Sequence, residues 1–197
     1  MGTITLPTSP GKKDEVFAIE RSDFDVQLMT MRSVSYTSPH YRWVYSFTLP
    51  KQKWATARIW AARLNQLAAF DNSFQASPPG YAGPSSGYAG PAPKVKGGSQ
   101  TGKSLACDGV TLSTAIALEG DYISFNGELH QLSADANSDS SQNVTFALCE
   151  MMRSSPANNA DVELDAPVAT FKLRDAGAAY SADYLTLFDI QVQAYEP

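Results

Sequence analysis

Apolar and polar positions alternate along residues 41–49, and this run gives the clearest structural signal in the chain. A period of two is typical of a β-strand with one buried face. Pro50 follows directly and is expected to end the strand, because proline cannot donate a ladder hydrogen bond. The odd positions are Tyr41, Trp43, Tyr45, Phe47 and Leu49. With shorter strand-like segments at 16–19 and 24–28, the run predicts β-structure with an aromatic buried face.

The period changes after Pro50, where apolar residues recur at steps of three and four up to residue 70. This spacing predicts one amphipathic α-helix over residues 51–70. Asp71 and Asn72 are suitable residues for ending it. The apolar stripe comprises Trp54, Ala57, Trp60, Ala61, Leu64, Leu67 and Ala68, and the basic side comprises Lys51, Lys53, Arg58 and Arg63. We interpret the stripe as packing surface.

Residues 73–102 are rich in proline and glycine and contain the pentamer GYAGP twice, at 80–84 and 87–91. Such a composition does not form a packed core or a regular helix, which predicts a linker or a long surface loop. It is interpreted either as a semi-rigid spacer or as an ordered arm that lies on a neighbouring subunit. In the second case Tyr81 and Tyr88 are the expected anchors.

Strand signals return over residues 104–164, at 109–112, 121–125, 128–132 and 144–148. The dipeptide Asn126-Gly127 between two alternating segments predicts a tight hairpin. Short strands at this spacing indicate a small barrel or sandwich of about 60 residues. The sequence therefore predicts a second β-structure that begins near residue 103.

Two further strands are predicted near the end, at 168–173 and 184–195. The alternation of the second shifts phase at Asp189, which fits a β-bulge. A strand in this place needs a partner, and the strands before Pro50 are the natural candidates. The small β-structure would then be an insertion in a discontinuous first domain.

Composition and charge narrow the classes of function. The net charge is −5, and the 15 Lys and Arg residues form no run, so direct binding to nucleic acid is not expected. The N-terminal residues contain no apolar run, and no stretch approaches the length of a membrane helix, so neither secretion nor membrane insertion is expected. Cys107 and Cys149 are interpreted as small buried hydrophobic residues, although a disulfide between them stays open.

One string suggests nucleotide chemistry. Residues 97–104 (GGSQTGKS) match the P-loop pattern, and residues 185–189 resemble a Walker-B segment that ends at Asp189. A working P-loop requires a buried strand before it and a helix after it, and neither flanking sequence has that character. Nucleotide hydrolysis is therefore not expected, and the chain is not predicted to be an enzyme.

Other candidate sites are weak. The segment 135–139 imitates the start of a calcium-binding loop but lacks the required glycine and the final glutamate. His40 and His130 are not in a recognisable nucleophile setting. Paired carboxylates such as Glu163 and Asp165 are expected to share an exposed strand face. No catalytic residue, cofactor site or metal site is predicted.

The order of several motifs from about residue 41 onward resembles the distal tail proteins of long-tailed bacteriophages. The likeness begins with the aromatic strand, the helix with its two tryptophans and the Pro/Gly-rich stretch. The motifs that follow are QTG at 100–102 with Ser104-Leu105, GDYI at 120–123, LHQL at 129–132, ADANSD at 134–139, NVTF at 143–146, MRSSPA at 152–157, FKL at 171–173 and the closing segment 184–196.

The resemblance implies a mainly β fold: a β-sandwich-type belt domain with one α-helix, plus an inserted small barrel of OB-like or galectin-like type. The expected boundaries are 1–72 and 166–197 for the belt, 73–102 for the arm or linker and 103–165 for the barrel. It also implies a homo-oligomeric ring, commonly a hexamer, that joins the tail tube protein to the tail hub proteins. In the family the QTG segment opens the barrel and binds no nucleotide.

The resemblance further implies a virion protein of the tail tip that is present in the host cytoplasm during assembly. Candidate contacts between subunits are Trp43, Tyr45, Tyr81 and Tyr88. A carbohydrate-binding module is the alternative, in which exposed Tyr or Trp residues of the barrel stack on sugars of the host surface. A P-loop NTPase, the enzyme alternative, would lose its nucleotide affinity on Lys103→Ala.

Overall fold

A computed structural model describes residues 2–21, 24–27, 33–36, 41–69, 72–174, 180–182 and 187–197. The chain divides into two compact units. Unit 1 comprises residues 1–21, 42–79 and 170–197, and unit 2 comprises residues 22–41 and 80–169. Across the described residues the fold is mainly β, with one α-helix, as the sequence predicts.

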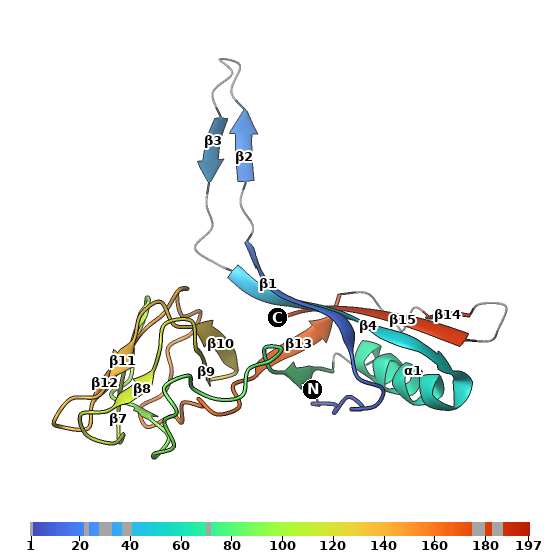
Figure 1. Cartoon of the computed structure of the whole chain (residues 1–197). Helices are drawn as coiled ribbons and strands as arrows, with labels where there is room; N and C mark the ends of the chain where they lie inside the picture. The colour runs from blue at the N-terminus through green and yellow to red at the C-terminus, as the bar shows by residue number, and fades with distance from the viewer. Residues whose placement is uncertain are drawn as a thin grey trace. The chain divides into compact units, whose positions relative to one another are not determined.

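Unit 1 is built on a six-stranded sheet with the order β1-β4-β15-β13-β5, and β14 also pairs with β15 (Figure 1). The helix α1 (Trp54–Ala68) packs against the face that carries Phe47, whose ring centroid lies 6.0 Å from that of Trp60. The described part of unit 1 is thus one sheet with one helix, and it contains no second sheet packed as in a sandwich. The strands are β1 (Lys13–Arg21), β4 (Tyr41–Lys53), β5 (Phe74–Ala76), β13 (Ala169–Leu173), β14 (Tyr180–Ala182) and β15 (Leu187–Tyr195).

The strand β4 continues through Pro50, although the sequence predicts an end there. It pairs antiparallel with β15, and the register shifts between Phe188↔Gln52 and Ile190↔Leu49. Across this interval β4 contributes Pro50 and Lys51, whereas β15 contributes only Asp189. Proline is tolerated at a bulge because the ladder is already interrupted there. The bulge predicted from the phase of Asp189 is confirmed, but its extra residue lies on β4.

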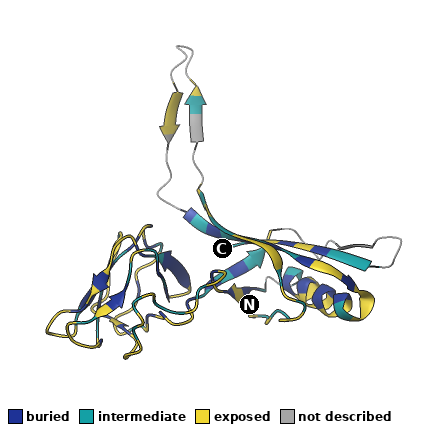
Figure 2. Ribbon diagram, in the orientation of Figure 1, coloured by how far each residue is buried: buried dark blue, intermediate teal, exposed yellow. Residues whose placement is uncertain are grey.

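An aromatic cluster forms the core of unit 1. Every odd position of β4 from Tyr41 to Leu49 is buried, as the alternation predicts (Figure 2). The Phe17 ring of β1 lies 5.0 Å from Trp43 and 5.7 Å from Phe171, between ring centroids. Buried aromatic rings contribute large apolar areas, so strands that are distant in sequence are held together by this cluster.

The helix buries the face that its periodicity predicts, through Ala57, Trp60, Ala61, Leu64 and Leu67. Trp54 differs, because its side chain is 50% exposed and contacts Phe188 with a centroid distance of 5.1 Å. Asn72 donates from Nδ2 to the carbonyl oxygens of Gln66 and Ala69, which confirms its expected role at the helix end. Asp71 lies outside the described residues.

Unit 2 contains short strands in small antiparallel sheets. The pairs are β9 with β10, β8 with β11 and β2 with β3, and β7 lies between β6 and β12. The bounds are β2 (Phe24–Gln27), β3 (Ser33–Tyr36), β6 (Lys94–Val95), β7 (Ser104–Asp108), β8 (Ala115–Ala117), β9 (Tyr122–Phe125), β10 (Glu128–Gln131), β11 (Ala136–Asn137) and β12 (Val144–Ala147).

Two turn positions decide the local structure of unit 2. Asn126 and Gly127 have φ values of +52° and +79° and join β9 to β10, which confirms the predicted two-residue hairpin. The prediction of a strand at 109–112 is wrong, because β7 ends at Asp108. Gly109 has φ +79°, so the chain turns where its composition favours a strand.

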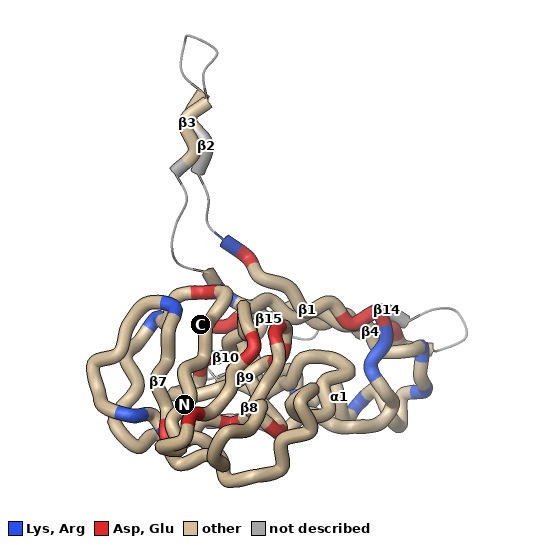
Figure 3. Tube along the Cα trace, turned by 60° about the vertical axis from the view of Figure 1, so that its left-hand side comes forward, with Lys and Arg blue, Asp and Glu red and all other residues tan. Residues whose placement is uncertain are grey.

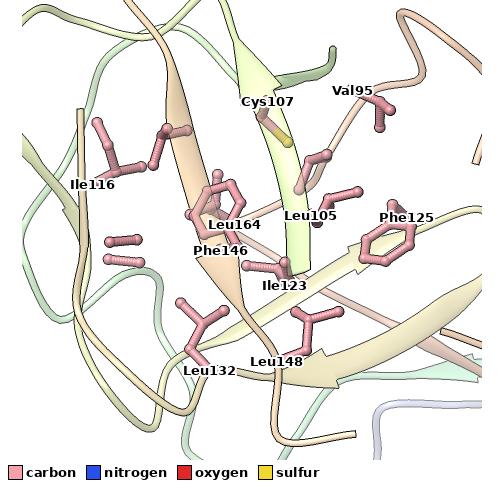
Figure 4. Packing of buried hydrophobic residues seen from close by; sticks show 14 of the residues in the cluster. Val95, Leu105, Cys107, Ile116, Ile123, Phe125, Leu132, Phe146, Leu148 and Leu164 are labelled. Carbon is pink, nitrogen blue, oxygen red and sulfur yellow. The ribbon is translucent and has the colours of Figure 1, made fainter. Parts of the chain in front are cut away.

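A hydrophobic cluster fills the centre of unit 2 (Figure 4). Val95, which belongs to the Pro/Gly-rich tract, is fully buried in this cluster, and Tyr88 packs against it. The tract therefore contributes to a core, contrary to the sequence interpretation of 73–102 as a linker or surface loop. The physical reason is that hydrogen bonds from polar side chains hold the extended tract on the core, so a few apolar side chains are enough for it to take part in the packing. Other members include Leu105, Cys107, Ile116, Ile123, Phe125, Phe146, Leu148 and Leu164.

The first prediction tests this packing. An added Cβ at Gly90 would lie 2.5 Å from the Tyr88 hydroxyl oxygen and 2.6 Å from Thr111 Oγ1. Gly90→Ala should lower the free energy of unfolding by about 1–3 kcal/mol in urea, because the Tyr88 side chain must move. Gly11→Ala is the control, since no atom lies within 4 Å of its added Cβ. Equal stability of the two variants would contradict the packing of the tract.

Candidate functional site

The P-loop string occupies the connection between two strands of one sheet. The strands β6 and β7 pair antiparallel, with Lys94 opposite Asp108 and Val95 opposite Cys107. Ser104, the last residue of the string, begins β7 and not a helix. The string is therefore a loop between antiparallel strands, and the convergent amides of a helix N-terminus are not present behind it.

Polar groups of the chain itself fill this loop. Gln100 donates from Nε2 to the Lys96 and Ala106 carbonyl oxygens, and its Oε1 accepts the Ala106 N–H at 2.7 Å. The Gly97 N–H donates to Asn158 Oδ1 at 2.7 Å. Lys103 Nζ donates to the Cys149 carbonyl oxygen at 2.8 Å. The Lys103 ammonium and the Gly97 amide, which would meet phosphate in a P-loop, thus donate instead to Cys149 and Asn158.

The Walker-B-like segment does not complete a nucleotide site with the P-loop string. Asp189 lies in β15 of unit 1, opposite Ser181 of β14, whereas the string belongs to unit 2. Leu185 and Thr186 of the segment lie outside the described residues. The structure does not bring the two motifs into one fold unit.

Tyr81 and Tyr88 anchor the two GYAGP repeats to their own chain. The Tyr81 hydroxyl donates to the carbonyl oxygens of Tyr122 (3.2 Å) and Leu164 (3.0 Å). Burial, and then the charge of Asp121, raise the pKa of Tyr81 to about 12, so its hydroxyl stays protonated as a donor. The Tyr88 hydroxyl donates to the Pro91 carbonyl oxygen and accepts the Thr111 N–H.

A buried carboxylate adds a third anchor. Asp121 accepts from the N–H and the hydroxyl of Ser85, at 2.9 and 2.5 Å, and from the Leu118 N–H at 2.8 Å. Because a buried carboxylate requires such donors, this contact fixes the tract between the repeats. The expected contact of Tyr81 and Tyr88 with a second subunit stays a prediction, but both hydroxyls already have partners in unit 2.

Trp43 and Tyr45, the other candidate subunit contacts, are buried in unit 1. Trp43 packs against Phe17, and the Tyr45 hydroxyl donates to the Glu15 carboxylate and accepts from Lys12 Nζ at 2.8 Å. In the single chain these two side chains therefore offer little area to a neighbour.

A pocket of about 540 Å³ lies beside this contact in unit 1. Burial lowers the pKa of Lys12, against the opposing charge of Glu15, and burial together with Glu15 raises the pKa of Tyr45. The Lys12 ammonium also lies over the Tyr45 and Phe47 rings, at 4.9 and 5.0 Å from their centroids. The pocket is lined by Thr3, Ile4, Thr5, Leu6, Pro7, Thr8, Lys12, Glu15 and Gln75.

Unit 2 contains a buried polar cluster around Glu128. This carboxylate accepts the Arg153 N–H at 3.0 Å and the Ser154 hydroxyl at 2.5 Å, and lies 3.3 Å from His130 Nε2. His130 is fully buried, and its ring stacks on Phe125 with a centroid distance of 4.8 Å. The cluster joins the β9–β10 hairpin to residues 153–154, and it has the character of a structural clamp.

The electrostatics of the cluster favour an ionised Glu128. Burial raises its pKa, but the hydrogen bonds from His130, Ser154 and the Arg153 N–H outweigh this effect and lower the pKa to about 2. Burial raises the pKa of Glu150, whose Oε2 accepts the Gln131 N–H at 3.4 Å. Spacing in the sequence gives no indication of this cluster, because Glu128 and Ser154 meet only through the fold.

The remaining candidates carry little chemistry. Cys107 is buried, as expected, and burial raises its pKa to about 12, but Cys149 is exposed, contrary to the expectation. The two thiols are free. Glu163 and Asp165 are both exposed, as their spacing predicts. His40 lies outside the described residues.

Two further searches concern metals and membranes. No group of three or more His, Cys, Asp or Glu side chains in the described ranges could hold a metal ion. Asp139 of the calcium-like loop accepts from the N–H groups of Ser141 and Asn143. None of the described helical residues form a helix long and apolar enough to cross a membrane.

No protein-family model matches this chain, and a comparison with curated proteins finds no significant match.

The second prediction concerns the Glu128 clamp. A carboxylate with a pKa lowered in the folded state stabilises the fold above its unfolded pKa of about 4.3, and this stabilisation is lost as the pH falls toward 2. Glu128→Gln should therefore lower the free energy of unfolding at pH 7 by about 2–3 kcal/mol. Its unfolding should also depend less on pH between 4.5 and 2 than that of the wild type.

The control is Glu119→Gln, because the Glu119 side chain is exposed. Urea unfolding followed by circular dichroism at several pH values measures both effects. Parallel pH profiles for Glu128→Gln and the wild type would show that Glu128 does not act as an ionised clamp.

Proposed function

We propose that this chain is a structural component of a bacteriophage tail tip and forms a ring that joins the tail tube to the tip hub. The proposal begins from the order of motifs, which resembles the distal tail proteins. It assigns no catalytic role, and the closed loop at residues 97–104 agrees with that assignment.

The observation that carries the proposal is the architecture of unit 1. The pairing of β4 with β15 joins residues 44–53 and 187–195 in one sheet of unit 1, while residues 80–169, which lie between them in the sequence, belong with residues 22–41 to unit 2. A discontinuous belt with an inserted β-rich unit is the arrangement that the resemblance implies. The β-rich character of both units, with one helix in the described residues, supports the same proposal.

The edge strand β1 supports self-association. It has β4 as its neighbour at the end of the sheet order, and its Val16 side chain is 54% exposed. Ile19 of the same strand is also exposed. An edge with exposed apolar side chains is an aggregation liability in a monomer, and pairing with another chain removes that liability. Head-to-tail contacts of this kind close into a ring when the rotation between subunits permits it.

The carbohydrate-binding alternative has less support. Sugar stacking needs an exposed aromatic ring, and the exposed large hydrophobic side chains of residues 80–169 are Leu112 and Met151. Tyr81, Tyr88 and Tyr122 are only partly exposed, and the first two use their hydroxyls as anchors. We therefore assign unit 2 a role in the assembly.

The third prediction is the oligomeric state. The purified chain should form a ring with a mass several times the 21.2 kDa of one subunit, visible by light scattering and negative-stain microscopy. Val16→Lys should weaken the assembly about tenfold or more, since a charge on an edge strand opposes pairing. Met151→Lys, an exposed apolar residue of unit 2, is the matched control. A strictly monomeric species at high concentration would contradict the proposal.

A further inference from the structure

The outer face of α1 is basic and partly apolar. Residues 51–69 contain no acidic residue and four cationic ones, Lys51 and Lys53 at the end of β4 and Arg58 and Arg63 on α1. All four side chains are exposed. Figure 3 marks the basic positions of this region in blue. Trp54 and Ile59 are each 50% exposed on the same helix. We call these six residues the basic helix face.

Several observations indicate that this face is not simply solvated. An exposed tryptophan and isoleucine between cations combine the residue types that are enriched in protein interfaces. The helix has no acidic residue in its first turn and no side-chain hydrogen bond at its N-cap, Lys53, so the positive end of its dipole is not compensated locally. The side-chain amide of Gln52, directly before the N-cap, is buried, and neither its nitrogen nor its oxygen has a hydrogen-bond partner. The chemistry favours an acidic partner with some apolar surface.

The chain itself contains a surface of that kind. Residues 104–152 carry seven Asp and Glu residues and no Lys or Arg. Asp121, Glu128 and Glu150 are buried, and the Lys96 ammonium approaches the segment of Asp139, where it donates to Asn143 Oδ1 at 2.6 Å. Three exposed members, Glu119, Asp135 and Asp139, lie on two segments that pair through β8 and β11. The Glu119 N–H donates to Asp135 Oδ1, and the Ser113 N–H donates to the Asp139 carbonyl oxygen.

An exposed apolar residue completes this surface. Leu112 is 48% exposed and directly precedes Ser113, so it lies beside the segment that carries Asp139. We call Leu112, Glu119, Asp135 and Asp139 the acidic edge. Charge and apolar character thus match between the basic helix face and the acidic edge, and the two surfaces belong to different units of the chain.

We propose that the basic helix face of one copy docks on the acidic edge of a second copy of this chain. The proposal rests on the ring assembly proposed above and names the surfaces that would meet in it. Because the two surfaces differ, the contact is head-to-tail. An open oligomer then has a free basic helix face at one end and a free acidic edge at the other, and these two surfaces can meet to close a ring. Opposite charges also oppose wrong pairings, since two helix faces or two acidic edges repel each other.

The fourth prediction uses two charge-reversed variants. Lys53→Glu, Arg58→Glu and Arg63→Glu together make the helix face acidic, because only Lys51 stays positive. Glu119→Lys, Asp135→Asn and Asn137→Lys together make the acidic edge basic, because only Asp139 stays negative, and an asparagine at 135 can still accept the Glu119 N–H. All six side chains are exposed, so the free energy of unfolding should change little. Each variant alone should associate at least tenfold more weakly than the wild type, because like charges then face each other.

A mixture of the two variants is the decisive arm. Each reversed helix face then meets a reversed acidic edge, and each natural face meets a natural edge, so an equimolar mixture should recover assembly in a ring of even subunit number. Analytical ultracentrifugation measures the masses in about 0.1 M salt, where charges interact over about 10 Å. Raising the salt to about 1 M should reduce the difference between the variants.

The control adds negative charge away from both surfaces and away from β1. Ala92→Glu with Ala157→Glu places two carboxylates at exposed positions of unit 2 and should assemble like the wild type. Normal assembly of both reversed variants would overturn the docking proposal but would leave the proposed ring unaffected. Two monomeric variants that stay monomeric when mixed would overturn it as well. A monomeric wild type would overturn both the ring and the docking.

Discussion

The antiparallel pairing of β4 with β15 is the contact on which the rest of unit 1 depends. It joins residues 44–53 to residues 187–195 and so closes a loop of well over a hundred residues. Closing such a loop is entropically unfavourable, and the aromatic cluster of Trp43, Tyr45, Phe47 and Phe171 stabilises it by burial. The bulge at Pro50 lets β4 run on to Lys53, where α1 begins and turns back over the core.

Unit 2 depends on a different balance between apolar burial and polar anchors. Its strands are short, and the cluster around Leu105 and Phe146 supplies the core. Buried carboxylates then fix the irregular segments: Asp121 holds the tract between the GYAGP repeats, and Glu128 holds residues 153–154. Such carboxylates stabilise only when they are fully hydrogen-bonded, which explains why each accepts several donors.

The two units also divide the charge of the chain between them. The described part of α1 is basic, and residues 104–152 are free of Lys and Arg. In the proposed docking this separation gives each surface a complementary partner on a second copy. The exposed edge of β1 adds backbone groups that can pair, so the assembly proposal rests on both backbone and charge.

Local patterns in the sequence determined most of the elements. The period of β4, the helical stripe, the Asn126-Gly127 turn and the phase shift at Asp189 follow from backbone geometry and are found where they were expected. The same patterns did not predict that Val95 is part of a core, that Trp54 and Cys149 are exposed, or that Glu128 contacts Ser154. For the P-loop string, the flanking sequence already argued against nucleotide chemistry, and the antiparallel strands β6 and β7 stand where such a loop would need a strand and a helix. Periodicity reports which face a residue occupies, whereas burial and hydrogen-bond partners depend on segments that meet only in the tertiary structure.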